Sequence, residues 1–374
     1  MILTTAELER RHIRRAQYTS CDDAFIDVRL PGSAPKENYA IVGPGVTQNA
    51  DQFVNLREPH GFNIGAAGLA PGITNNLHLH FTAEVFIACE GRYTLRWGVR
   101  GDEGEATLDE GDVICMPTWM FRGFSNTGQR HGFLMTVLGG DDTGGIIWSP
   151  EVMRRARETG LWLGRDNQLI DLPPGSPSPD AEALLPMMPT EEVQALRRWS
   201  TAEMQARRVT SSQRDFRPAT IDSALPGHGW QIAPVAGWGV SQSRDHLPAV
   251  VEPQGFSIEW LRVPAGQSSA AFELDQAAVL VHAGGPLTVG FNAGCDVGAA
   301  LNAWDTLSMP AGCRRRFINT GSTDAQALLI VQGDGRKTPR FVDDVHERAA
   351  ALDVVLDAGG RLARRSLLPP AMTA

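Results

Sequence analysis

Two histidines and a glutamate stand close together in the sequence PGITNNLHLHFTAEVFIACEG, which covers residues 71–91. In a β-strand alternate side chains share a face, so His78 and His80 are expected to point the same way. A turn after His80 can then bring Glu84 to the same side from the next strand. Two imidazoles and one carboxylate on one side of a divalent ion leave coordination positions open for substrate or dioxygen. The spacing therefore predicts a catalytic metal site with His78, His80 and Glu84 as ligands.

The alternative interpretation is a strand with two exposed histidines and a nearby surface acid. If the three side chains are buried, each unpaired polar group costs about 2 kcal/mol or more, so they need a metal or other partners. This cost favours the metal site for a buried group.

The chain repeats itself at an offset near 194 residues. Three pairs of segments show the repeat: LTTAELERRHI (3–13) with WSTAEMQARRV (199–209), EPHGFNI (58–64) with EPQGFSI (252–258), and MPTWMFRGFSNTG (116–128) with MPAGCRRRFINTG (309–321). A constant offset over the whole length indicates two similar domains in tandem. We expect an N-terminal domain over 1–165, a linker over 166–194, rich in Pro and Ser, and a C-terminal domain over 195–374.

Each copy is expected to open with a short helix, because Thr4 and Glu7 fit a capping box and the second copy has an equivalent pair. Short apolar runs that end in Gly or Pro then predict many strands. A second helix is expected to close each copy, near 150–158 and 343–352. The sequence therefore predicts an all-β protein with short helices at the ends of each copy.

Composition excludes several classes of function. The net charge of −9 and the lack of a long Lys/Arg stripe argue against a nucleic-acid partner. No run of 18 apolar residues occurs, so no membrane span is expected, and the charged N-terminal segment is unlike a signal peptide. The five cysteines show no CxxC spacing, which favours reduced thiols in a cytoplasmic protein.

The first copy resembles the cupin superfamily. The segment with Gly72, His78, His80, Glu84 and Gly91 is similar to the first cupin motif, and the segment from Gly111 to Asn126 is similar to the second. With two copies the chain resembles a bicupin of the gentisate- or quercetin-type dioxygenases. The resemblance implies two antiparallel cupin barrels (double-stranded β-helix or jelly-roll folds), with a metal held in the barrel by two His, one Glu and a second-motif His.

The chain departs from this pattern in both copies. In the first copy Trp119 stands where the second motif has a glycine, and Arg122 stands where it has a histidine. In the second copy the three ligands are replaced, at an offset of 194, by Phe272, Leu274 and Ala278. We therefore expect metal in the first barrel only, held by three protein ligands, and an apolar interior in the second.

Arg122 has two interpretations. Its guanidinium can clamp a substrate carboxylate or oxyanion near the metal. Alternatively it is structural, because Arg315 holds the same place in the second copy, and both copies have an aspartate in the preceding turn (Asp112 and Asp305) that can pair with it.

Other residues near the motifs are also candidates. Trp119 and Phe121 are expected either to line the barrel mouth and bind an aromatic or apolar substrate, or to pack in the core. His131 is a possible extra ligand but is expected at an exposed turn, and His60 at the surface or rim. Asn126 and Asn319 are expected to hold turns through side-chain hydrogen bonds.

The site predicts an Fe(II) dioxygenase acting on a small aromatic or carboxylated substrate, with Glu84 and Arg122 as catalytic residues. A first alternative keeps the metal without dioxygen, as in a decarboxylase, lyase or isomerase, where Mn, Ni or Zn can serve. A second alternative is a non-catalytic ligand-binding bicupin. In each case we expect a small-molecule partner and a homo-oligomer.

Overall fold

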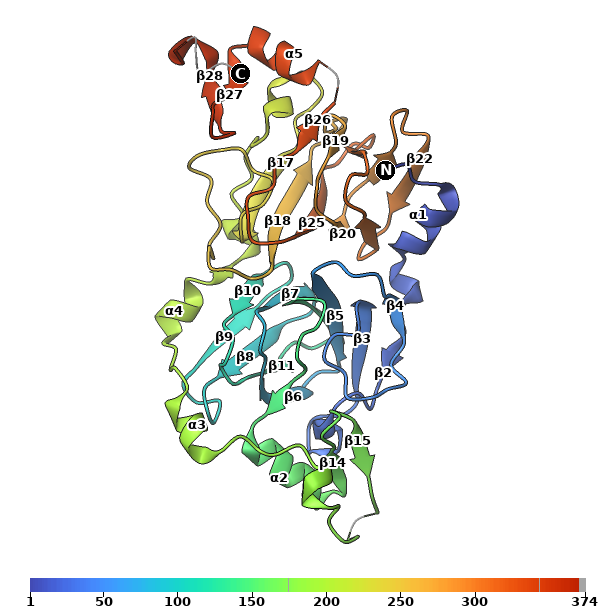
Figure 1. Cartoon of the computed structure of the whole chain (residues 1–374), viewed down its shortest axis with the longest axis vertical. Helices are drawn as coiled ribbons and strands as arrows, with labels where there is room; N and C mark the ends of the chain where they lie inside the picture. The colour runs from blue at the N-terminus through green and yellow to red at the C-terminus, as the bar shows by residue number, and fades with distance from the viewer. Residues whose placement is uncertain (174, 343, 370–374) are drawn as a thin grey trace. The chain divides into compact units, whose positions relative to one another are not determined.

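The computed structural model describes residues 1–173, 175–342 and 344–369 (Figure 1). Strands dominate it, as the sequence predicts, and the chain divides into two compact units. The first unit is Tyr18–Ser212, and the second unit is Met1–Gln17 together with Gln213–Ala374.

The first unit contains two sheets that enclose a core. One sheet has the strand order β16-β10-β7-β12-β5-β3-β2, with β4 paired to β3, and the other has the order β13-β6-β11-β8-β9. The strands of the larger sheet are β2 (Ser20–Cys21), β3 (Lys36–Val42), β4 (Val54–Leu56), β5 (Phe62–Leu69), β7 (Glu84–Glu90), β10 (Val113–Met116), β12 (Gly132–Gly139) and β16 (Arg208–Val209). Those of the smaller sheet are β6 (Thr74–Leu79), β8 (Tyr93–Trp97), β9 (Gly104–Leu108), β11 (Arg122–Asn126) and β13 (Ile147–Trp148).

The second unit has the same plan. Its two sheets have the orders β1-β23-β20-β25-β18-β17 and β22-β21-β24-β19-β26. The first of these sheets contains β1 (His12–Ile13), β17 (Gln231–Ala236), β18 (Phe256–Val263), β20 (Ala278–Gly284), β23 (Thr306–Met309) and β25 (Ala325–Gln332). The other contains β19 (Phe272–Glu273), β21 (Leu287–Phe291), β22 (Val297–Leu301), β24 (Arg315–Ile318) and β26 (Arg340–Phe341).

The duplication predicted from the sequence is present in the strands. β5, β7 and β8 of the first unit recur as β18, β20 and β21 of the second at an offset of 194, and the central sheet order is the same in both. The register supports this, because β12 pairs with β5 and β7 as β25 pairs with β18 and β20. The two barrels are therefore built on one template.

Short helices and hairpins surround the sheets. The α-helices are α1 (Thr5–Arg11), α2 (Pro150–Glu158), α3 (Thr190–Ala195), α4 (Thr201–Gln205) and α5 (Val345–Ala351). The 3₁₀ helices are η1 (Arg15–Gln17), η2 (Ile26–Arg29), η3 (Ala181–Ala183), η4 (Ser211–Gln213), η5 (Ile221–Ala224) and η6 (Arg365–Leu367), and the hairpins are β14 (Leu161–Leu163) with β15 (Leu169–Asp171) and β27 (Val354–Leu356) with β28 (Leu362–Arg364).

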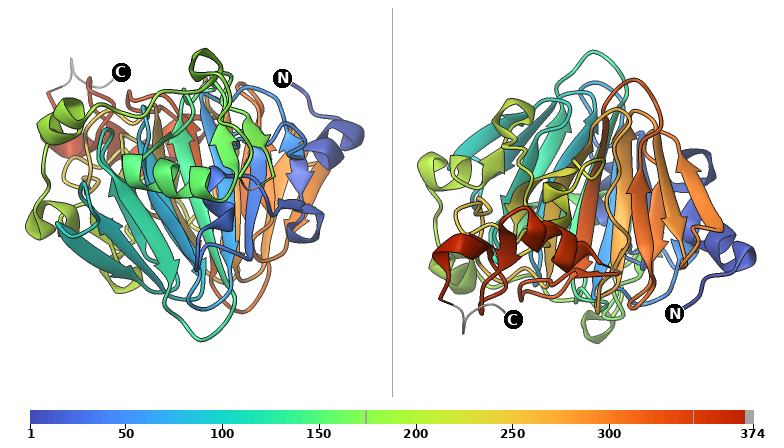
Figure 2. Two further views of the ribbon diagram at one scale, coloured as in Figure 1. Left: turned by 90° about the horizontal axis from the view of Figure 1, so that it is seen from below. Right: turned by 90° about the horizontal axis from the view of Figure 1, so that it is seen from above.

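The helices that close each copy, α2 and α5, lie where the sequence predicts them, although residue 343 is outside the described residues. Both predicted capping boxes are present at α1 and α4. Helix α2 lies across one end of the strands of the first unit (Figure 2). Among the described residues, no helix has the length and apolar character needed to cross a membrane.

The opening segment of each copy belongs to the unit of the other copy. Strand β1 pairs with β23 and places His12 opposite Leu307, and Leu3 and Leu8 are buried in the core of the second unit. In the same way β16 pairs with β10, and Met204 of α4 is buried in the core of the first unit.

This exchange differs from the expected boundaries of 1–165 and 195–374, which kept each opening helix with its own copy. The capping boxes and apolar residues of the two helices are nearly the same, so their sequences carry no signal for which barrel they join. The linker is also part of the first unit, where Leu184 is buried and the Leu185 N–H donates to Leu163 O.

Two asparagines hold equivalent turns, as predicted. Asn126 Nδ2 donates to Leu69 O at 2.7 Å and to Arg130 O at 2.8 Å. Asn319 Nδ2 donates to Val263 O and to Thr323 O, both at 2.8 Å. Each side chain therefore joins the end of one strand (β5 or β18) to the turn that connects the two sheets of its unit.

A buried hydrogen bond between His12 and Asp305 helps to hold the exchanged segment of the second unit. His12 Nε2 lies 2.9 Å from Asp305 Oδ2, with side-chain exposures of 5% and 1%. Asp305 Oδ1 also accepts the Arg15 N–H at 2.9 Å. The pair thus closes the edge of the sheet where β1 joins β23.

We expect His12→Ala to lower the free energy of unfolding of the second unit by about 1–3 kcal/mol, because Asp305 loses a buried hydrogen-bond partner. Urea denaturation followed by fluorescence measures this change. Arg14→Ala is the matched control, since Arg14 and Glu9 form an exposed ion pair worth about 0–1 kcal/mol. Equal effects of the two substitutions would contradict the structural role of the buried pair.

Candidate metal centre

The three predicted ligands converge in the first unit. His78 lies in β6, His80 directly follows it, and Glu84 begins β7. One ligand atom from each residue lies within 4.8 Å of the other two, and all three side chains are buried. His80 Nε2 is 3.6 Å from Glu84 Oε1. The exposed-strand interpretation is therefore wrong, because the barrel interior encloses all three.

Backbone carbonyls set the tautomers of both histidines. His78 Nδ1 lies 2.7 Å from Asn76 O, and His80 Nδ1 lies 3.2 Å from Gly145 O. A ring nitrogen that faces a carbonyl oxygen carries the proton and donates it, so each Nε2 keeps a lone pair. Histidines that bind metals are oriented in this way by a second-shell acceptor. His80 Nε2 is buried and has no hydrogen-bond partner.

Arg122 pairs with Glu84. Its Nη2 and Nε donate to Glu84 Oε2 at 2.8 and 3.1 Å, and its Nη1 donates to Met120 O at 3.1 Å. The arginine side chain is fully buried. Glu84 therefore uses Oε2 for the arginine, while Oε1 faces His80.

The proposed Arg–Asp pair is wrong in both copies. Asp112 accepts from Arg208 of β16 at 2.6 Å, and Asp305 pairs with His12 of β1. Arg315 donates to backbone oxygens, including Pro310 O at 2.8 Å. Each aspartate binds the edge strand that comes from the opening segment of the other copy. The sequence around the aspartate does not predict that this strand pairs there.

The histidines are neutral at pH 7. Burial lowers the pKa of His78 to about 3, and the charge of Arg122 adds to the effect. Burial, again with Arg122, lowers the pKa of His80. Burial raises the pKa of Glu84, and the charge and hydrogen bonds of Arg122 oppose this rise. Neutral imidazoles bind a metal ion without first losing a proton.

Sequence reasoning missed a further polar residue at the site, Lys36. Its Nζ donates to Asn75 Oδ1 at 2.7 Å and to Asp27 Oδ1, and the side chain is 4% exposed. Burial lowers the pKa of Lys36, and the charge of Asp27 opposes this effect. Lys36 and Lys337 are the only lysines in the sequence, and both are buried.

Comparison of the two copies could have identified Lys36 as a candidate site residue. At the offset of 194 its counterpart is Trp230, whose Nε1 donates to Asp222 at 2.9 Å much as Lys36 donates to Asp27. The bond to an aspartate therefore does not require a lysine. The ammonium occurs in the copy that has the three ligands, and an indole replaces it in the copy that lacks them.

A small cavity joins these groups. Its volume is about 50 Å³. Since one water molecule needs about 10–15 Å³ of such space, the cavity admits a ligand of only a few heavy atoms. Its lining residues are Phe25, Lys36, Glu37, Asn38, Val46, Ala66, Ala67, Asn75, His78, His80, Glu84, Phe124, Thr136, Leu138 and Ile146.

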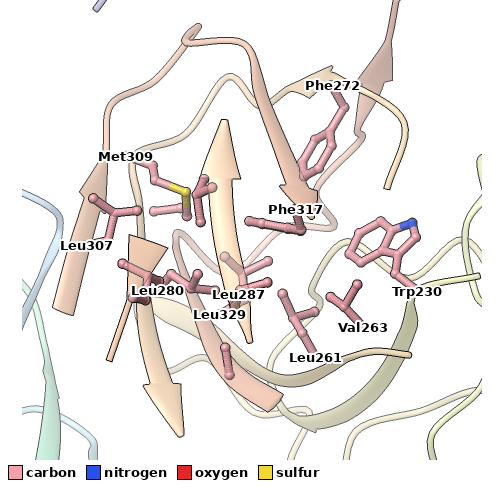
Figure 3. Packing of buried hydrophobic residues seen from close by; sticks show 14 of the residues in the cluster. Trp230, Leu261, Val263, Phe272, Leu280, Leu287, Leu307, Met309, Phe317 and Leu329 are labelled. Carbon is pink, nitrogen blue, oxygen red and sulfur yellow. The ribbon is translucent and has the colours of Figure 1, made fainter. Parts of the chain in front are cut away.

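The second barrel is apolar at the positions of the three ligands, as predicted. Phe272, Leu274 and Ala278 replace the three ligands, and all three are fully buried in one hydrophobic cluster. Trp230 stacks on Phe272, with ring centroids 5.7 Å apart and planes at 18° (Figure 3). Phe317 packs edge-on against Phe272 in the same interior.

Trp119 and Phe121 occupy different environments. Trp119 is 43% exposed, and its ring lies 5.4 Å from that of Phe81 in an edge-to-face contact. It lines a second cavity of about 530 Å³ in the first unit. Phe121 is buried with Leu79 and Val193 and lines neither cavity, so it fits the core-packing alternative.

Two other histidines lie away from the three ligands. His131 is half exposed, as expected, and its Nε2 lies 3.3 Å from Glu37 Oε2. The prediction for His60 is wrong, because His60 is 2% exposed. Its N–H donates to Asp141 Oδ1 at 2.8 Å, which draws it into the loop after β12.

The residues fit a divalent metal ion. The donor set contains two neutral imidazoles and a carboxylate, all buried, and His80 Nε2 is an orphaned acceptor that faces Glu84. Such an acceptor in a buried site calls for a cation or a donor. Two nitrogens and one oxygen suit Mn, Fe, Ni and Zn alike.

Comparison with known proteins identifies the fold. The structure resembles vicilin from Solanum melongena (TM-score 0.53, 14% identity, covering 89% of this chain and 86% of that one) and vicilin from Corylus avellana (0.51, 11%, 88% and 87%). It also resembles oxalate decarboxylase from Bacillus subtilis (0.50, 11%, 89% and 78%). These neighbours are two-domain cupins, and this chain therefore has the bicupin fold.

At the level of sequence, no protein-family model matches the chain and no curated protein is significantly similar to it. The identities of 11–14% to the solved structures support the fold alone. The chemistry must therefore be argued from the residues of the site.

We expect His78→Ala with His80→Ala to abolish binding of transition metal while the fold remains intact, because two of three ligands are lost. Elemental analysis of protein purified from metal-supplied cultures, together with circular dichroism, measures both effects. His131→Ala is the control, since this half-exposed histidine lies outside the group. Normal metal content in the double variant would contradict the assignment.

We expect Arg122→Ala to lower the free energy of unfolding of the metal-free protein by about 3–5 kcal/mol at pH 8, because it leaves Glu84 buried without its countercharge. The folded-state pKa of Glu84 then rises further above its ordinary value of 4.5. The folded state binds more protons than the unfolded state between these two values, so stability falls as pH rises through this window.

We therefore expect Arg122→Ala to lower the free energy of unfolding less at pH 5 than at pH 8. Urea denaturation of protein whose metal has been removed by a chelator measures this difference. Arg315→Ala is the matched control, because Arg315 is equally buried but donates to backbone oxygens. A loss from Arg122→Ala that does not change with pH would show that the carboxylate pair is not its cause.

Proposed function

We propose that the first unit binds a divalent metal at His78, His80 and Glu84 and removes carbon dioxide from a small carboxylate without net consumption of dioxygen. The observation that carries this proposal is the cavity of about 50 Å³ in which the three ligands and Lys36 meet. A cavity of this size admits a small carboxylate but not an aromatic ring, and the Lys36 ammonium on its wall can bind that carboxylate.

Lys36 supplies positive charge on the wall of this cavity. Two of its three ammonium hydrogens serve Asp27 and Asn75, which leaves one donor for a ligand. Asn75 and Asp27 hold the ammonium in place, and Asp27 is itself fixed by the Asn76 N–H at 3.0 Å. A rigid donor of this kind orients a substrate carboxylate with little loss of entropy.

The reaction needs no oxidant. The bond between the carboxylate carbon and its neighbour breaks, the electron pair stays on the neighbour, and a proton is added there. A bound divalent ion would act as a Lewis acid on a substrate oxygen. Arg122 keeps Glu84 oriented toward the ligand nitrogens, and the closed barrel limits water at the reacting carbon.

The resemblance to oxalate decarboxylase supports this choice at the level of fold only. Manganese, iron, nickel and zinc all suit the donor set, so each of them can serve as the metal. The expected cytoplasmic location and homo-oligomeric state stay predictions.

An Fe(II) dioxygenase is the second candidate. One observation favours it: three protein ligands, with Arg122 in place of a fourth, leave more coordination positions for dioxygen beside a substrate. A non-catalytic binding protein such as a vicilin-like bicupin would not need a buried group with an orphaned His80 Nε2.

We expect metal-loaded protein to release carbon dioxide from one member of a panel of small acids (oxalate, malonate, oxaloacetate, acetoacetate and their phenyl-substituted analogues) with less than a tenth of an equivalent of dioxygen consumed. Carbon dioxide detection beside an oxygen electrode measures both quantities. Lys36→Met should keep its metal and raise KM at least about tenfold by removing the anion contact. Lys337→Met, at the other buried lysine, is the control.

Stoichiometric oxygen uptake would overturn this proposal in favour of the dioxygenase. A wild-type KM in Lys36→Met would remove the assigned role of Lys36.

A further inference from the structure

A larger cavity lies beside the candidate metal centre within the first unit. Its volume of about 530 Å³ is in the range of small-molecule sites. Phe81, Trp119, Trp148, Met187 and Met188 are among its lining residues. We call it the outer chamber, and its walls are mostly apolar.

The outer chamber shares its walls with the metal centre. Ile146 lines both cavities. The Trp148 ring lies 5.3 Å from the His78 ring. Phe81 directly follows His80, and the Trp119 N–H donates to His80 O at 3.3 Å. A ligand in the chamber therefore lies next to the segments that hold the two histidines.

Trp119 is held in an unusual backbone conformation. Its φ is 56°, in the left-handed region that disfavours residues with a side chain. The second copy has Gly312 at this position, with φ of 67° and nothing near the place of its Cβ. The first copy thus carries a large aromatic side chain where the second copy has a glycine. Strain of this kind is typical of functional sites.

The strained residue also exposes apolar surface. Trp119 is 43% exposed and Phe81 41%, and their rings meet at 89° at the chamber. An edge-to-face pair leaves an indole face on which a further ring can stack. Met187 and Met188 add thioethers, which pack well against aromatic rings.

We propose that the outer chamber binds an aromatic ring attached to the substrate carboxylate, with the ring against Trp119 and Phe81 and the carboxylate toward Lys36 and the metal ligands. The inference rests on the function proposed above and names its substrate class as an aryl-substituted small acid. Ile146 lines both cavities, so the connection between ring and carboxylate must pass this side chain.

The test compares phenylacetate, cyclohexylacetate and acetate, which share one carboxylate. Isothermal titration calorimetry with metal-loaded protein measures each affinity. We expect phenylacetate to bind at least about tenfold more tightly than acetate, and more tightly than cyclohexylacetate. In Trp119→Gly we expect this preference to fall to about twofold or less. The melting temperature should be unchanged or higher, because glycine relieves the strained φ.

Phe53→Ala is the matched control, because Phe53 is an exposed aromatic of the same unit (51%) outside the chamber. Full phenylacetate affinity in Trp119→Gly would overturn the proposal, as would equal binding of phenylacetate and acetate by the wild type. Equal binding of cyclohexylacetate would overturn the aromatic assignment.

The His78→Ala, His80→Ala variant separates this inference from the proposed function. If the variant keeps wild-type affinity for both phenylacetate and acetate, the metal plays no part in carboxylate binding and the proposed function fails, while the ring site stands. If it loses acetate binding but keeps a Trp119-dependent preference for the ring, both proposals are supported.

Discussion

The burial of a charged carboxylate beside two neutral imidazoles is the constraint on which the first barrel depends. Glu84 is surrounded by protein, and among the described residues Arg122 is the cation that pairs with it. Burying a polar group without a hydrogen-bond partner costs free energy, so the neighbouring backbone carbonyls accept hydrogen bonds from the side chains of this site. Carbonyls of Asn76 and Gly145 fix the imidazoles, and the Met120 carbonyl fixes the guanidinium. His80 Nε2 is the one ligand nitrogen of the described group that is buried without a hydrogen-bond partner, and it is therefore available to bind a cation.

The second barrel shows how the same template is stabilised without the three ligands. Phe272, Leu274, Ala278 and Trp230 occupy the positions of the polar residues and form a continuous apolar interior. Arg315 is retained but turns to backbone oxygens. Replacing buried charges by well-packed apolar side chains is often neutral or stabilising. The second copy therefore has apolar packing at the ligand positions, while the first carries the less favourable polar group of the proposed metal site.

The resemblance to the first cupin motif predicts the barrel fold, and the repeat extends this fold to the whole chain. Local spacing predicts the convergence of the three ligands, because a strand places His78 and His80 on one face. The turn-holding role of Asn126 followed from the same logic. Residues whose partners are distant in sequence were not predictable. Lys36 meets the site only through the closure of the barrel, and Asp112 was assigned to Arg122 because the edge strand that binds it, β16, begins nearly a hundred residues later.

The exchange of opening segments imposes an order on biosynthesis. His12 and its partner Asp305 are 293 residues apart, so at ribosomal rates about 15 to 60 seconds separate their emergence. A helix of seven residues does not persist alone, and Leu3 and Leu8 stay in contact with water until the last barrel appears. The first unit, by contrast, has all its strands once Ser212 is made. The nascent chain thus completes its polar barrel first, with its own beginning as the final piece to dock.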